Sequence, residues 1–89
     1  MDKKAFQKFV KKFRNEGDEF PKAMMYGSQM RKRQATINCG STTKSNEIVD
    51  KIIDSGLDEF LESQNARGYE VEKSLNQRSQ VISQIRIYY

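Results

Sequence analysis

The residues of this chain best suited to chemistry are cations, and they concentrate at its start. The first fourteen residues hold one acid, Asp2, against six cations: Lys3, Lys4, Lys8, Lys11, Lys12 and Arg14. A dense group of fixed cations is typical of proteins that bind nucleic acid, an anionic membrane or an acidic partner. These six residues are the first candidates for contacts with phosphate groups.

A second group of cations is the run Arg31, Lys32 and Arg33. Neighbouring side chains point in different directions, so three consecutive cations suit a phosphate backbone better than they suit a single carboxylate. If folding brings this run beside the N-terminal cations, the two groups form one basic surface. The alternative is that both groups are ordinary solvated polar surfaces.

The segment from residue 39 to residue 45 resembles the phosphate-binding loop of nucleotide hydrolases, which ends in Gly-Lys-Ser/Thr. Lys44 and Ser45 fit that ending, but Thr43 stands where the loop has glycine, and the spacing from Gly40 is too short. We therefore reject ATP or GTP hydrolysis and keep Lys44, at the start of an expected helix, as a contact to one phosphate. The alternative is simple helix capping by Thr43 or Ser45.

Catalytic and metal-binding residue types are scarce. The chain has no histidine and one cysteine, Cys39. Without imidazole, the common zinc sites and nucleophilic triads are not expected, and a lone cysteine behaves as a small core hydrophobe. We expect no enzymatic activity, no metal and no cofactor. The lack of a possible intramolecular disulfide, of a signal peptide and of a long apolar run predicts a cytoplasmic protein without a membrane partner.

Three tyrosines are candidates for stacking on nucleobases: Tyr26, Tyr88 and Tyr89. Single-stranded RNA is often bound by aromatic stacking. The alternative is that these rings close the edge of the core, where tyrosine is common. The terminal pair suits a dimer contact equally well.

The N-terminal cations require a helix to position them. Phe6, Phe9, Val10 and Phe13 recur at helical spacing, so a helix from Asp2 to Arg14 places them on one face and fans the cations over the rest. Gly17 ends this helix. A second, short helix is expected after Pro21, with apolar content from residues 23–26 and 30.

The remaining elements are a strand, a long helix and a hairpin. Residues 34–39 alternate as a short strand does, and apolar residues on one stripe predict a core helix over 45–62, where Gly56 permits close approach of a neighbour. Residues 69–89 fit two strands about a turn near 76–79. The alternative is a C-terminal helix, which would make the protein mostly α. The favoured fold is one α+β domain spanning residues 1–89.

Charge is segregated along the chain. Residues 1–44 hold eleven Lys and Arg against four acids, whereas residues 45–62 hold six acids against Lys51 alone. One small body therefore presents a basic surface and an acidic surface. Only 36% of the residues are hydrophobic, so the core is small for the length, and we expect a homodimer to supplement it.

These patterns favour a non-catalytic nucleic-acid-binding protein that binds phosphates through its basic helix face and its Arg/Lys cluster. RNA is favoured over duplex DNA because no helix-turn-helix, zinc finger or basic zipper is evident in the sequence. The alternative is a small inhibitor or adaptor, of the kind made by phages and mobile elements, that blocks a nucleic-acid-handling enzyme, with or without bound RNA. A peripheral membrane helix is the least favoured interpretation, because so small a core needs the Phe side chains.

Overall fold

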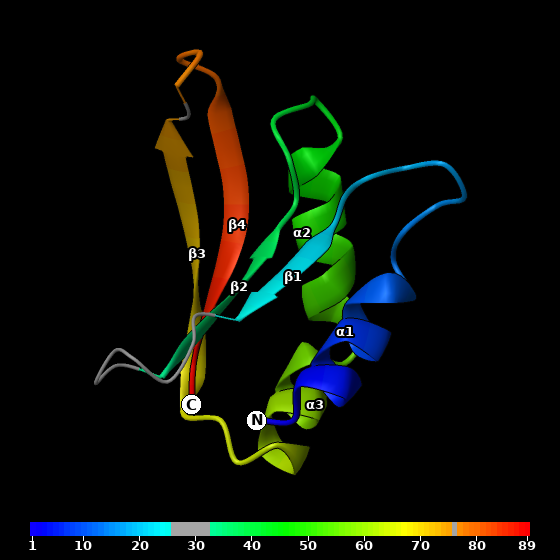
Figure 1. Ribbon diagram of the computed structural model, residues 1–89, viewed down its shortest axis with the longest axis vertical. Coiled ribbons are helices and arrows are strands. Elements are labelled where there is room, and N and C mark those ends of the chain that lie inside the picture. Colours follow the sequence, from blue (N-terminus) through cyan, green and yellow to red (C-terminus); the bar gives the residue numbers. More distant parts are fainter. Residues whose placement is uncertain (26–32, 76) are drawn as a thin grey trace.

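One antiparallel sheet carries helices on one of its faces (Figure 1). The computed structural model describes residues 1–25, 33–75 and 77–89. The strand order is β1-β2-β4-β3, which confirms the predicted α+β class. The described elements, in chain order, are α1 (Lys3–Lys11), β1 (Lys22–Met25), β2 (Gln34–Asn38), α2 (Ser45–Asp54), α3 (Leu57–Ser63), β3 (Gly68–Leu75) and β4 (Val81–Tyr88).

The core lies between the helices and the two central strands. Alternate residues of β2 and β4 point toward the helices, so Ile37, Ile85 and Ile87 are fully buried. The helices contribute side chains that are equally buried, among them Phe6, Val10, Ile52 and Leu57. The opposite face of β4, at positions 84, 86 and 88, has no helix over it (Figure 1).

Helix α1 forms where the apolar spacing predicts it. The Asp2 carboxylate accepts a hydrogen bond from the Ala5 backbone N–H at 3.3 Å and caps the helix. Phe9 stacks on Phe60 of α3 with ring centroids 4.3 Å apart and an interplanar angle of 10°. Since its apolar side chains are core residues, α1 is an integral part of the domain.

The single helix predicted over 45–62 is wrong, because the helix is interrupted at Gly56. Gly56 has a φ of 105°, which an L side chain rarely adopts, and this left-handed residue separates α2 from α3. The apolar stripe continues across the break, with Ile52 and Leu57 both fully buried. Periodicity alone therefore does not reveal the interruption.

Replacing Gly56 by alanine is expected to lower the free energy of unfolding by about 1–2 kcal/mol, the cost of left-handed backbone in an L residue. The added Cβ would lie 2.8 Å from the Glu59 Oε2, which can move because it ends a flexible side chain. Chemical denaturation followed by circular dichroism measures the change, with exposed Ser55→Ala as the control. A neutral Gly56→Ala would show that the helix break does not need glycine.

The short helix predicted after Pro21 is also wrong over residues 22–25, which form strand β1, and the rest of that prediction lies outside the described residues. This strand pairs antiparallel with β2, so that Ala23 lies opposite Ile37. Sheet pairing thus overrides the weak local preference for helix. Tyr26, Arg31 and Lys32 lie outside the described residues.

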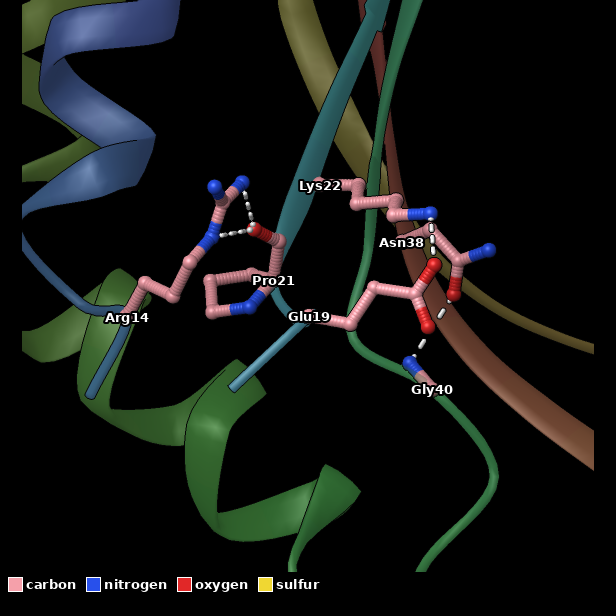
Figure 2. Close-up of polar contacts among 6 residues, drawn as sticks. All are labelled: Arg14, Glu19, Pro21, Lys22, Asn38 and Gly40. Atoms are coloured by element: carbon pink, nitrogen blue, oxygen red, sulfur yellow. Dashed lines mark hydrogen bonds and ion pairs between the residues drawn. The ribbon is translucent and has the colours of Figure 1, made fainter. Parts of the chain in front are cut away.

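Side-chain contacts fix the entry to β1. Figure 2 shows the Arg14 guanidinium donating to the Pro21 carbonyl oxygen, at 3.2 Å from Nε and 2.8 Å from Nη2. Glu19 pairs with Lys22 nearby, and this contact lowers the pKa of the Glu19 carboxyl (Figure 2). On the adjoining strand, the Asn38 side chain accepts a hydrogen bond from the Gly40 backbone N–H at 2.9 Å.

The C-terminal hairpin is confirmed, and the alternative of a C-terminal helix is wrong. Strands β3 and β4 pair over eight residues, from Gly68 opposite Tyr88 to Leu75 opposite Val81. The connection contains neither Gly nor Pro, and Ser79 takes the left-handed conformation there with a φ of 60°. In the described ranges, no helix has the combined length and apolarity needed to cross a membrane.

Candidate functional site

Helix α1 presents an exposed basic surface, here called the lysine face, on the side away from the core. Its members are Lys3, Lys4, Lys8, Lys11 and Lys12, and all five are exposed. None of them pairs with a carboxylate of the described residues, and Lys12 instead places its Nζ 5.7 Å from the centre of the Phe9 ring. Like charges one helical turn apart, such as Lys4 and Lys8, repel each other. An anionic ligand would relieve that repulsion.

Arg14 lies just beyond α1 and differs from the five lysines. Its guanidinium is already hydrogen-bonded to the Pro21 carbonyl, which ties the end of α1 to the start of β1 (Figure 2). The residue therefore has an evident structural role, in addition to the phosphate contact predicted for it.

Lys44 is the exposed N-cap residue of α2, and its side chain makes no capping hydrogen bond. In the turn before the helix, the Thr42 Oγ1 accepts from the Lys44 N–H at 3.2 Å, and the Ser45 Oγ accepts from the Thr42 N–H at 2.9 Å. The helix capping predicted for Thr43 or Ser45 is therefore wrong, because no side chain of the described residues caps the first N–H groups of α2. The adjoining pocket of about 520 Å³ is lined by two lysines but by three carboxylates, so its charge does not favour phosphate.

A second basic surface lies at one end of the helix-free sheet face. It is a pocket of about 630 Å³, here called the arginine–tyrosine pocket. Its lining residues are Arg33, Gln34, Arg67, Gly68, Tyr69, Glu70, Arg86 and Tyr88. The pocket joins Arg33 and Tyr88, which the sequence singled out, to Arg67 and Arg86, which it did not. Sheet register explains the omission, because these arginines stand alone in the sequence and meet only when β2, β3 and β4 align.

Arg86 is held in place across three strands. Its Nη1 donates to the Gln34 Oε1 at 3.2 Å on β2, and its Nη2 donates to the Glu72 Oε2 at 2.9 Å on β3. Gln84 donates to the same Glu72 oxygen at 3.1 Å. The Arg86 Nε is buried without a hydrogen-bond partner among the described residues. The guanidinium is thus a fixed planar group beside the pocket.

Tyr88 is also held by a contact within the sheet. Its hydroxyl donates to the Glu70 Oε2 at 3.0 Å, and this hydrogen bond raises the pKa of Tyr88 above the ordinary value. The hydroxyl therefore stays protonated at neutral pH. Tyr88 and Arg86 are two residues apart on β4, so they point to the same face of the sheet.

Arg33 and Arg67 stand on either side of the end of β4. The Arg67 N–H donates to the Tyr88 carbonyl oxygen at 2.7 Å, and the Tyr89 N–H donates to the Arg33 carbonyl oxygen at 3.0 Å. Both arginine side chains are exposed, and neither pairs with a carboxylate in the described part of the chain. Their backbones are therefore fixed while their charges face solvent. Tyr89 is partly buried and packs against the core.

Both chain termini lie near one end of the molecule (Figure 1). The Asp2 N–H, just before the first lysines, donates to the Gln64 Oε1 at 3.1 Å. Gln64 precedes Arg67 by only three residues, which span at most about 11 Å. The start of the lysine face and Arg67 of the pocket thus lie at the same end of the molecule.

Comparisons with protein-family models, curated proteins and solved structures find no match for this chain. The functional argument therefore depends on the geometry of its own residues.

Cys39 is the remaining reactive residue type, and it is 1% exposed. Burial raises the pKa of its thiol from 9.0 to about 12, so the thiol stays protonated in the folded protein. In the residues that the structure describes, no three potential metal ligands of the His, Cys, Asp and Glu types form a cluster.

At pH 8, Cys39 is expected to react with iodoacetamide about a thousandfold more slowly in the folded protein than in denaturant, because the pKa difference lowers the thiolate fraction by that factor. Because the thiol has a higher pKa in the folded state than in the unfolded state, it also contributes to the free energy of unfolding. This contribution is complete below pH 9 and is lost as the pH rises toward 12. Mass spectrometry over time measures the alkylation. Equal rates in the two states would contradict burial of Cys39.

Proposed function

We propose that this protein is a non-catalytic RNA-binding protein whose lysine face binds phosphates. The observation that carries the proposal is the combination found on α1: five exposed lysines unpaired with any described carboxylate, on a helix whose other side is fixed in the core. Because the backbone of the helix is already fixed, these cations meet a polyanion without the helix having to fold first, which favours affinity.

The distribution of acids supports the same surface. The acidic side chains of α2 and α3 are exposed and belong to helices other than the one that carries the lysine face: Glu47, Asp50, Asp54, Asp58, Glu59 and Glu62. Repulsion from these carboxylates would keep a polyanion off α2 and α3 and direct it toward α1 and the end of the sheet.

The chemistry of the lysine face favours contacts to the backbone of the nucleic acid. Lysine is a point charge on a flexible stem, and it suits phosphate more than the edge of a chosen base. Gln7 is an exposed neutral polar residue of α1, on the same side of the helix as the lysine face. Binding through the lysine face is therefore expected to depend weakly on sequence and strongly on salt.

Native purification without nuclease tests this proposal. We expect the purified protein to carry nucleic acid, seen as a raised ratio of absorbance at 260 nm to that at 280 nm, which RNase abolishes and DNase does not. A protein free of nucleic acid but bound to a stoichiometric protein partner would contradict it and favour the inhibitor or adaptor alternative.

The mass of the RNase-treated protein also tests the proposal that the protein is a homodimer. Exposed apolar residues on the hairpin offer a contact for a second copy, with Val71 49%, Leu75 71% and Val81 51% exposed. A mass of about 21 kDa, twice the 10.4 kDa of one chain, is expected for the dimer. A mass of one chain at micromolar concentration would overturn the dimer without affecting RNA binding.

A further inference from the structure

We infer that the arginine–tyrosine pocket binds one unpaired nucleotide, with its base against Tyr88 and Arg86 and its phosphate at Arg33 and Arg67. The inference rests on the proposed function and extends it, because it makes the protein selective for single strands. It concerns a different face of the molecule from the lysine face.

The charge of the pocket favours an anionic ligand. Three arginines line it against one carboxylate, Glu70. Arg86 is paired with Glu72, so the unpaired charges are those of Glu70 and of Arg33 and Arg67, which are exposed and unpaired with any described carboxylate. The backbones of these two arginines lie on either side of the end of β4, and a phosphate is the anion whose geometry guanidinium forks match.

The planar groups of the pocket require a flat ligand as well as an anionic one. Tyr88 and Arg86 share one face of β4, and each is held by its neighbours: Tyr88 by Glu70, and Arg86 by Gln34 and Glu72. Nucleobases stack on tyrosine rings and on guanidinium planes. Because both groups are already fixed, stacking on them costs little conformational entropy.

The pocket wall also provides hydrogen-bonding groups for a base edge. Gln34 contributes an amide that can donate, and Glu70 contributes a carboxylate that can accept from an exocyclic amino group. A volume of about 630 Å³ falls within the range of pockets that hold small organic ligands. A base within a duplex is stacked and paired, so it cannot enter such a pocket, whereas a base of a single strand can.

The position of the pocket fits a ligand that also reaches the lysine face. Gln64, bonded to the Asp2 N–H, and Arg67, at the pocket, are three residues apart. One strand could therefore run from the first lysines of α1 around this end of the molecule to the pocket. The lysine face would then supply general affinity, and the pocket would supply the preference for unpaired RNA.

The test compares two RNA ligands of equal total charge by fluorescence anisotropy: a single-stranded oligoribonucleotide and a blunt RNA duplex. We expect the protein to bind the single strand about tenfold more tightly, within the range measured for stacking of one base on an aromatic ring. Arg67→Ala, an exposed position, and Tyr88→Ala are expected to reduce this preference to less than about threefold without changing duplex affinity. Tyr88→Phe keeps the ring and is expected to keep the preference.

The outcomes separate this inference from the proposed function. Failure to bind either RNA overturns the proposed function, whereas equal binding of the two RNAs overturns only the inference. A single-strand preference that survives both Arg67→Ala and Tyr88→Ala also overturns it. Circular dichroism of each variant checks that the fold is retained.

Discussion

Replacing Phe6 by alanine is expected to lower the free energy of unfolding by about 3–5 kcal/mol, the usual cost of truncating a buried phenylalanine. Phe6 lies in α1, is 0% exposed and is one of the largest fully buried side chains. A domain of 89 residues has a total stability of about 4–13 kcal/mol at the usual value per residue. The substitution would therefore remove a large share of the stability.

Urea unfolding followed by circular dichroism measures this loss. Gln7→Ala is the matched control, because Gln7 is the next residue of the same helix and is exposed, and its change is expected within about 0.5 kcal/mol. A loss below about 1 kcal/mol for Phe6→Ala would mean that α1 separates from the domain at little cost. The helix would then be a detachable basic arm instead of a fixed platform.

The double charge reversal Lys4→Glu with Lys8→Glu is expected to weaken RNA binding about 25-fold or more at 0.1 M salt. For single strands, each phosphate contact raises the affinity at 0.1 M salt by about 0.7 log units relative to 1 M salt. The loss of two contacts therefore removes about 1.4 log units, which is a factor of about 25. Repulsion by the new carboxylates adds to the loss. Anisotropy titration with a fluorescent oligoribonucleotide measures it.

The matched control is the double reversal Lys51→Glu with Lys73→Glu. Lys51 on α2 and Lys73 on β3 are exposed and lie outside both basic surfaces, and both double variants lower the net charge from +4 to zero. The control is expected to lose less than about fivefold in affinity. Equal losses in the two variants would show that RNA senses only the overall charge, and the lysine face would have no special part.

Much of the fold follows from local periodicity. The spacing of Phe6, Phe9 and Val10 predicts α1, and alternation predicts the central strand and the hairpin, because each of these elements buries one face against the core. Periodicity failed at Gly56, where the apolar stripe continues through a left-handed residue. It also failed at residues 22–25, where pairing with β2 decides the conformation. The sequence shows the glycine but not its left-handed conformation, and the pairing of residues 22–25 depends on a strand outside that segment.

The two basic surfaces differ in the same way, because one depends on a local sequence pattern and the other on strand pairing. The lysine face could be predicted because one helix positions all five side chains, and the helix was recognised from its own residues. The arginine–tyrosine pocket could not, because Arg33, Arg67 and Arg86 lie in three separate segments. Their convergence depends on the register of β3 and β2 against β4, which no local pattern specifies.

The salt dependence of RNA binding tests the central claim most directly. Fluorescence anisotropy would measure the dissociation constant of the unmodified protein for a single-stranded oligoribonucleotide at several salt concentrations between about 0.05 and 0.4 M. If all five lysines of the lysine face contact phosphates, the logarithm of affinity should fall against the logarithm of salt with a slope of about −3.5. A slope near zero, or no binding at the lowest salt, would contradict the claim.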